Sequence, residues 1–196
     1  MSSPLQPQVE TVVKVGGGLL ATVEYLDAAL GIAAEAARAR HLLIVPGGGP
    51  FADAVRAVDR QIGIPDSAAH WMAVLAMDQY AHLIAARLAD AVLVADQREI
   101  GSAFDAGRIP VLTPSRWLRD ADPLPHSWDV TSDSIAAWIA GSVGARRLVL
   151  VKPPGLQCLD ETVDPYFAHA LPPSVATEVV PADRIDVLRS ALSRSG

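Results

Sequence analysis

The chain has 196 residues, of which 51% are hydrophobic and 19% charged, and it carries a formal net charge of -6 at pH 7. This length supports one sizeable hydrophobic core, so we expect a single domain over residues 1–196. The acidic balance and the scattered basic residues argue against a nucleic-acid-binding surface and favour a small-molecule partner.

Short apolar runs alternate along the chain with longer segments of helical period. The runs are rich in β-branched residues and apolar on both faces, which predicts buried parallel strands. They lie at 11–15, 41–46, 91–95, 109–114, 146–152 and 176–181. Helices are predicted over 23–40, 50–62, 66–89, 96–107, 131–143 and 183–193. Segment 114–130 contains three prolines and predicts a loop with at most one short helix. The alternation predicts a three-layer αβα sandwich with a mostly parallel central sheet.

Two glycine triplets each follow a predicted strand and precede a helical pattern. They are Gly16, Gly17 and Gly18, and Gly47, Gly48 and Gly49. Ligands of open α/β sheets bind outside the carboxyl ends of the strands, so we expect both triplets at one ligand-binding edge. Successive backbone N–H groups in such turns suit phosphate, whereas a tight turn without a ligand is the alternative. Neither triplet fits a Walker loop or the dinucleotide fingerprint.

Three motifs, in order along the chain, resemble the amino acid kinase family, which includes acetylglutamate, glutamate, aspartate, uridylate and carbamate kinases. VVKVGGGLL at 12–20 resembles the family's Lys-x-Gly-Gly opening, and IVPGGGPFAD at 44–53 resembles its second glycine loop. WDVTSDSIAAWIAGSVGARRLVLVK at 128–152 resembles its Ser/Asn-Asp-x-x-Ala-Ala-x-x-Ala helix and the strand that follows. The resemblance implies an ATP-dependent phosphotransferase with Mg²⁺ and an amino acid kinase-like fold.

Within the family, PLPHSWDVTSDSIAAWIA followed by LVLVK resembles the short kinases of methanofuran and methylofuran biosynthesis. That resemblance implies phosphorylation of a small phosphate-bearing acceptor, aminomethyl-furanmethanol phosphate, to its diphosphate. Composition and spacing do not distinguish a phosphate acceptor from a small carboxylate acceptor. A non-catalytic phosphate or oxyanion binder, and a structural or regulatory subunit, also stay open.

Lysine occurs only at Lys14 and Lys152, among 16 basic residues. A core strand reading VVKV rarely tolerates an unpaired charge, so we predict that Lys14 contacts the transferred phosphoryl group. The resemblance gives Asp133 the role of orienting the catalytic lysines. This sequence lacks the family's later Gly-Gly-Met segment with a second catalytic lysine, which implies a shortened C-terminal part of the nucleotide site. We predict that Lys152 replaces that lysine; a surface position at a strand end is the alternative.

Other candidates complete the predicted site. We expect Gly16, Gly17, Gly18 and Ser132 to bind the nucleotide or the transferred phosphate, and Gly47, Gly48, Gly49, Asp53 and Trp128 to bind the acceptor. An acceptor with a furan ring and an ammonium group would stack on Trp128 or make a cation–π contact. Asp129 either assists Mg²⁺ through water or caps a turn.

Three further features bear on location and assembly. The one cysteine, Cys158, has no internal disulfide partner, and the amino terminus has neither a basic start nor an apolar signal core. Polar residues interrupt every apolar segment before the roughly 20 residues that a bilayer span requires. We therefore expect a cytoplasmic protein that does not cross a membrane. The resemblance further implies a homodimer or higher homo-oligomer through the apolar segment 67–88.

Overall fold

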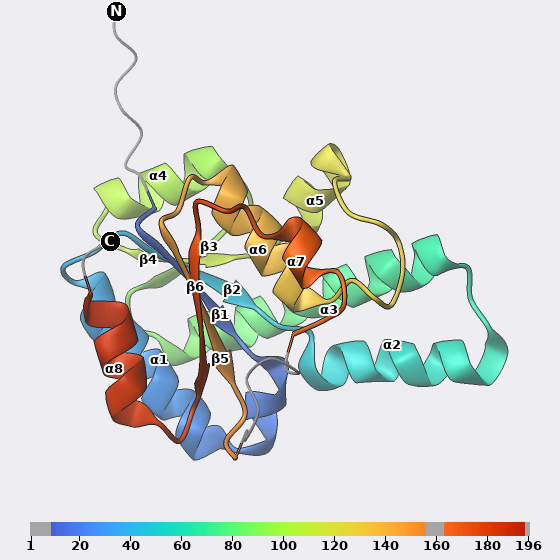
Figure 1. The fold of residues 1–196 in the computed structure, drawn as a ribbon, viewed down its shortest axis with the longest axis horizontal. Coiled ribbons are helices and arrows are strands. Elements are labelled where there is room, and N and C mark those ends of the chain that lie inside the picture. The colour runs from blue at the N-terminus through green and yellow to red at the C-terminus, as the bar shows by residue number, and fades with distance from the viewer. Residues whose placement is uncertain (1–8, 156–162, 195–196) are drawn as a thin grey trace, which may run out of the picture.

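The computed structural model describes residues 9–155 and 163–194, and its centre is a six-stranded sheet (Figure 1). The strands are β1 (Thr11–Val15), β2 (Leu42–Pro46), β3 (Ala91–Val94), β4 (Ile109–Leu112), β5 (Arg147–Lys152) and β6 (Ala176–Pro181). Their order is β3-β4-β2-β1-β5-β6, and every pairing is parallel. All six strands were predicted from the apolar runs, with ends that differ by two residues at most.

Helices cover both faces of the sheet. They are η1 (Gly17–Ala21), α1 (Val23–Ala37), α2 (Gly49–Ile62), α3 (Asp66–Arg87), α4 (Gln97–Asp105), α5 (Ser115–Ala121), α6 (Ser132–Ser142), α7 (Phe167–Ala170) and α8 (Ile185–Ser193). The six predicted long helices are confirmed, and α5 is the short helix expected within 114–130. The 3₁₀ helix η1 and the short α7 were not predicted, because one begins within a glycine triplet and the other has four residues. Among the described residues, no helix is long and apolar enough to span a membrane.

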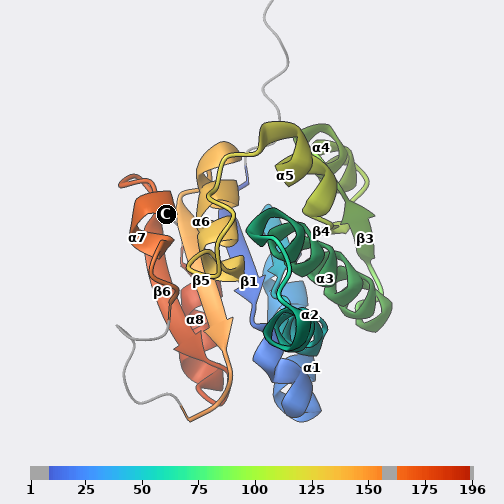
Figure 2. The ribbon, with the colours of Figure 1, turned by 90° about the vertical axis from the view of Figure 1, so that its right-hand side faces the viewer.

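The hydrophobic core has two parts, one on each face of the sheet. Because successive side chains of a strand point to opposite faces, Val12 of β1 packs with α6 on one face, while Val13 packs with α1 and α8 on the other. The long helix α3 contributes to both parts, with Val74 in the first and Tyr80 in the second. The predicted three-layer αβα sandwich is therefore confirmed (Figure 2).

The helices α2 and α3 form an antiparallel hairpin that extends away from the sheet (Figures 1 and 2). The helix α2 begins at Gly49, in the second glycine triplet, and the hairpin turns at Gly63, where φ is 63°. Since β1 and β2 are parallel neighbours, both triplets lie at the same edge of the sheet, as the sequence predicted.

Candidate active site

The two glycine triplets pack directly against each other. A Cβ atom on Gly17 would lie 2.0 Å from the backbone nitrogen of Gly49, and one on Gly47 would lie 2.6 Å from the backbone nitrogen of Gly17. Gly49 has a φ of 53°, a left-handed conformation that favours glycine. The close packing of one loop against the other therefore explains part of the need for glycine at these positions.

Gly16 and Gly18 seat the first loop on the end of β5. The backbone N–H of Gly16 donates to the carbonyl of Val151 at 2.8 Å, and its carbonyl accepts a hydrogen bond from the buried Tyr80 hydroxyl at 3.4 Å. A Cβ on Gly18 would lie 2.6 Å from Cγ of Pro153. These contacts fix the path of the loop, so the glycines are required by packing as well as by any ligand.

Beside these loops, two lysines converge on one aspartate. Lys14 of β1 and Lys152 of β5 lie on neighbouring strands and point to the face that α6 covers, because side chains alternate along a strand. The Lys14 Nζ atom lies 2.7 Å from Asp133 Oδ1, and the Lys152 Nζ atom lies 2.5 Å from Oδ2. The three residues are only 4%, 8% and 4% exposed for Lys14, Lys152 and Asp133, respectively. The alternative of a surface position for Lys152 is therefore wrong.

Burial and charge set the protonation of this cluster. Burial acts to raise the pKa of Asp133, but the charges of Lys14 and Lys152 outweigh it and hold that pKa below its ordinary value. Burial, reinforced by the nearby Lys14 charge, lowers the pKa of Lys152. Two ammonium groups and one carboxylate give the cluster one net positive charge, which suits an anionic ligand.

Asp164, which the sequence analysis did not identify, holds the start of α6 in place. Its carboxylate accepts hydrogen bonds from the Thr131 backbone at 3.0 Å, the Thr131 hydroxyl at 2.7 Å and the Ser134 backbone at 3.0 Å, and also from the Ser134 hydroxyl. A carboxylate at a helix N-terminus satisfies free N–H groups and complements the helix dipole. Asp164 therefore fixes the turn of α6 that carries Asp133.

A cavity of about 210 Å³ opens from the lysine–aspartate cluster and runs between α2, α3 and the loop before α6. We call the part beside Lys14, Asp133, Lys152, Gly17 and Gly49 the inner end. The part beside Asp66, His70 and Trp128 is the outer end. The wall between the two ends is mostly apolar, and it includes Ala52, Ala69, Ala73, Val74, Met77, Val130 and Ile135.

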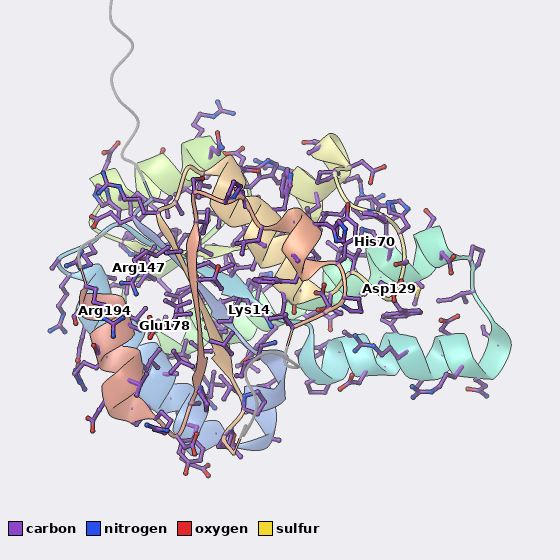
Figure 3. All side chains as sticks on the ribbon, in the orientation of Figure 1. Lys14, His70, Asp129, Arg147, Glu178 and Arg194 are labelled. Atoms are coloured by element: carbon purple, nitrogen blue, oxygen red, sulfur yellow. The ribbon has the colours of Figure 1, made fainter. Side chains whose placement is uncertain are left out.

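At the outer end, α2 fixes the indole of Trp128. Its Nε1 atom donates to Asp59 at 2.7 Å, and the guanidinium of Arg56 lies 4.9 Å from the ring centroid. Hydrogen bonds from the Ile64 backbone and from Trp128 lower the pKa of Asp59. His70 belongs to α3 and lies on the side of the molecule to which the α2–α3 hairpin projects (Figure 3). Its ring stacks on His126 at a centroid distance of 4.3 Å.

The structure brings together most of the predicted site residues. Those that line the cavity are Lys14, Gly17, Gly48, Gly49, Trp128, Ser132, Asp133 and Lys152. Gly16, Gly18 and Gly47 are not among its lining residues, because their backbones pack against β5, Pro153 and the other loop.

Two predicted carboxylates lie outside the cavity. Asp53 is on the exposed side of α2, with its side chain 71% exposed, and it pairs with Arg56 at 3.0 Å. Asp129 is exposed on the loop before α6 and is also absent from the cavity wall. The acceptor role predicted for Asp53 and the metal role predicted for Asp129 therefore have no support from their positions.

Protein ligands for a metal are few at this site. No group of three or more His, Cys, Asp or Glu side chains suited to a metal ion occurs within residues 9–155 and 163–194. The carboxylate at the inner end, Asp133, is already paired with both lysines. Magnesium in kinase sites is bound largely by water and substrate phosphates, so these side chains fit phosphate better than they fit a protein-bound metal.

Comparison with known proteins places this geometry in a family. The amino acid kinase family model matches residues 10–153. A curated relative from Methanocaldococcus jannaschii, "[5-(aminomethyl)furan-3-yl]methyl phosphate kinase", is 32% identical over 143 residues. The match covers 71% of this chain and 63% of the relative, so the chain spans less than two thirds of that relative's length.

Solved structures share the fold at low sequence identity. Uridylate kinase from Archaeoglobus fulgidus has a TM-score of 0.67 at 13% identity, covering 95% of this chain and 97% of that chain. UMP kinase from Bacillus anthracis has a TM-score of 0.69 at 14% identity, and the match covers 96% of this chain and 94% of that chain. At such identities the structures establish the fold alone, whereas the family model also covers all three motifs. The chain belongs to the amino acid kinase family.

Proposed function

We propose that this protein is an ATP-dependent phosphotransferase whose acceptor is the phosphate group of [5-(aminomethyl)furan-3-yl]methyl phosphate, the compound in the relative's name. The observation that carries the proposal is the buried cluster of Lys14, Asp133 and Lys152 at the glycine-loop end of a small cavity. The product is the corresponding diphosphate, and ADP is released.

Transfer of a phosphoryl group needs positioning and positive charge rather than covalent chemistry by the protein. An oxygen of the acceptor phosphate attacks the terminal phosphorus of ATP, and the bond from that phosphorus to the bridging oxygen of ADP breaks. Lys14 and Lys152 flank the reacting group and stabilise the charge on its oxygens and on the leaving oxygen. Asp133 holds the two ammonium groups at fixed positions.

The glycine loops supply backbone donors at the same place. Gly17, Gly48 and Gly49 line the inner end, and α2 begins at Gly49, so its N-terminus adds positive potential there. Ser132, in the first turn of α6, lines the cavity from the opposite side. Mg²⁺, when bound to the phosphates, supplies further neutralisation of their charge.

Two alternatives remain as outcomes of the test. A small carboxylate acceptor would use the same lysines with a single negative charge, and an oxyanion-binding protein would use them without turnover. The doubly anionic phosphate fits a cavity end with two buried lysines better than a carboxylate does, and it matches the substrate in the relative's name.

The test is ADP release from ATP and Mg²⁺ with four separate acceptors: the aminomethylfuran phosphate, uridylate, isopentenyl phosphate and acetylglutamate. We expect turnover with the furan phosphate and a diphosphate product by mass spectrometry. Turnover with acetylglutamate alone would establish the carboxylate alternative. ATP binding without ADP release for any acceptor would establish the oxyanion binder.

We further propose that the protein is a cytoplasmic homodimer. Large apolar side chains are exposed on the α2–α3 hairpin, namely Val58, Ile62, Met72 and Leu75. Light scattering after gel filtration measures the mass, for which we expect twice the 20.6 kDa of one chain. A single-chain mass at micromolar concentration would contradict this assembly.

A further inference from the structure

We propose that His70 and Asp66, at the outer end of the cavity, bind the ammonium group of the acceptor and so select phosphorylated amines. This inference rests on the proposed function, because it takes the acceptor phosphate to occupy the inner end. It assigns to α3 a role in substrate selection that is separate from phosphoryl transfer.

The periodicity of α3 places these two side chains on the face of the helix that lines the cavity. Asp66, His70 and Met77 all line the cavity, at spacings of four and seven residues that keep them on one face of a helix. At 1.5 Å per residue, His70 lies about 10 Å along the axis from Met77. A ligand that extends along this face from the apolar wall towards the outer end therefore meets His70 first, and Asp66 lies one helical turn, about 6 Å, further along the axis.

His70 is a buried polar group with an unused acceptor. The side chain is 8% exposed and lines the cavity, yet no hydrogen bond to it is present among the described residues. Burial, with a contribution from nearby His126, lowers the pKa of His70 to about 4, although the Asp122 charge acts in the opposite direction. A neutral imidazole has one ring nitrogen that accepts a hydrogen bond, and a ligand ammonium can donate to it.

The charges around His70 favour a cation. Asp66 forms no hydrogen bond or ion pair within the part of the chain that the structure describes. Arg56 lines the cavity at this end, but it already pairs with Asp53 at 3.0 Å and lies over the Trp128 ring. Arg119 lies over the Trp71 ring, which contacts His70, but Arg119 is not among the residues that line the cavity. The charge of Arg56 is thus matched by a carboxylate outside the cavity, and the Asp66 carboxylate remains for the ligand.

The two ends of the cavity are therefore opposite in charge preference. The inner end, with Lys14 and Lys152, suits a phosphate, and the outer end, with Asp66 and His70, suits an ammonium. A small acceptor with a phosphate at one end and an aminomethyl group at the other matches this polarity, whereas an acceptor with anionic groups at both ends does not.

The experiment compares two acceptors in the parent and in variants. The acceptors are [5-(aminomethyl)furan-3-yl]methyl phosphate and its 5-methyl analogue, which lacks the amine. The variants are Asp66→Asn and His70→Phe, the second of which keeps an aromatic ring against His126. The loss of one charge-assisted hydrogen bond to the acceptor should lower kcat/KM by about tenfold. We expect each variant to lose about tenfold with the amine and less than about twofold with the methyl analogue.

Asp186→Asn is the matched control, because Asp186 is also an exposed aspartate in the first turn of a helix, α8. We expect it to leave both acceptors unchanged. An equal loss with both acceptors in Asp66→Asn and His70→Phe would show a structural role and overturn the inference, as would an unchanged amine preference. If the parent turns over neither furan acceptor, the proposed function fails and the inference fails with it.

Discussion

The two ends of the cavity are built from different parts of the fold. The inner end is formed by the carboxyl ends of β1, β2 and β5 and the start of α6, where Lys14, Asp133 and Lys152 are almost fully buried. The outer end is formed by the projecting α2–α3 hairpin and the loop before α6, where Asp66 is exposed and Trp128 is half-buried. We infer that the rigid end carries the reaction and that the projecting end selects the acceptor.

This division has a physical reason. Strands that pair on both sides fix their side chains by many buried contacts, which gives the preorganised positive charge that phosphoryl transfer needs. The part of the α2–α3 hairpin that projects beyond the sheet (Figure 1) has fewer neighbours, so its exposed side chains, such as Asp66, are replaced at a lower cost in stability. Substitutions at the inner end should therefore have large effects on kcat and on stability, whereas substitutions at the outer end should have smaller effects, mainly on which acceptor is used.

Asp133→Asn is the change at the inner end with the largest expected effect. It leaves two buried ammonium groups without their shared carboxylate, and an uncompensated buried charge costs about 3–5 kcal/mol of stability. The loss of oriented lysines should also lower kcat by at least about a hundredfold. Thermal unfolding and steady-state kinetics measure the two effects, and inorganic phosphate should raise the melting temperature of the variant more than that of the parent.

Asp129→Asn is the control for Asp133→Asn, because it removes an exposed carboxylate four residues earlier on the same segment. We expect no change in either measurement. A loss of activity at low Mg²⁺ that saturating Mg²⁺ reverses would instead support the metal role that the sequence suggested for Asp129. A fully active, stable Asp133→Asn would remove the buried cluster from the proposed mechanism.

The replacements Lys14→Arg and Lys152→Arg test whether both ammonium groups act on the reacting phosphoryl group. The planar guanidinium is longer and cannot occupy the position of a compact ammonium beside a packed glycine loop. We expect kcat to fall about a hundredfold in each variant, the usual cost of one lost preorganised donor. Arg147→Lys, at the opposite end of β5, is the control and should leave kcat unchanged. Normal kcat in Lys152→Arg alone would show that Lys14 acts without it.

Gly17→Ala should destabilise the fold at the inner end without removing any charge. The new Cβ would lie 2.0 Å from the Gly49 nitrogen, so one of the two packed loops must move. We expect a loss of about 1–3 kcal/mol, as for other overpacked sites, measured by urea unfolding. Gly31→Ala in α1 is the control, because a Cβ there meets no atom within 4 Å. It should raise stability by up to about 1 kcal/mol. Equal stability of the two variants would contradict the loop packing.

The contrast between the two ends also explains what the sequence could predict. Each strand carries its own apolar run, so the sheet and its carboxyl edge were predictable, and the glycine triplets and lysines lie within local motifs at that edge. The periodicity of α3 indicates a helix, but not which of its faces meets a cavity, so His70 and Asp66 were missed. Asp164 was missed because its role depends on contacts with Thr131 and Ser134, about 30 residues earlier in the chain.

The triplets show a further limit of local motifs. Six glycines at strand ends indicated phosphate binding, yet Gly16, Gly18 and Gly47 are used for packing against neighbouring backbone and Pro153. A close approach of ligand to backbone and a close approach of backbone to backbone require the same residue type. Only the positions of the neighbouring loops separate these two causes, and those positions depend on the pairing of β1, β2 and β5.

The smallest expected effect is a shift in the pH dependence set by Lys152. Burial and the Lys14 charge lower the pKa of Lys152 from 10.5, so its ammonium loses the proton at a lower pH than an ordinary lysine does. If that ammonium stabilises the transferred group, kcat/KM falls as the pH rises through the lowered pKa.

The free energy of unfolding changes with pH in the opposite direction. Between the folded and unfolded pKa values the unfolded chain binds more protons, so this residue's contribution to the free energy of unfolding increases with pH. A pH profile of kcat/KM should therefore show a decline with rising pH whose midpoint lies below 10.5, the ordinary pKa of lysine. The melting temperature, measured at each pH, should show that the protein is still folded where kcat/KM declines. The residual activity of Lys152→Arg should lack this decline, because a guanidinium keeps its proton throughout the range. A decline of the same position and depth in Lys152→Arg would assign it to another group and leave Lys152 with a structural role only.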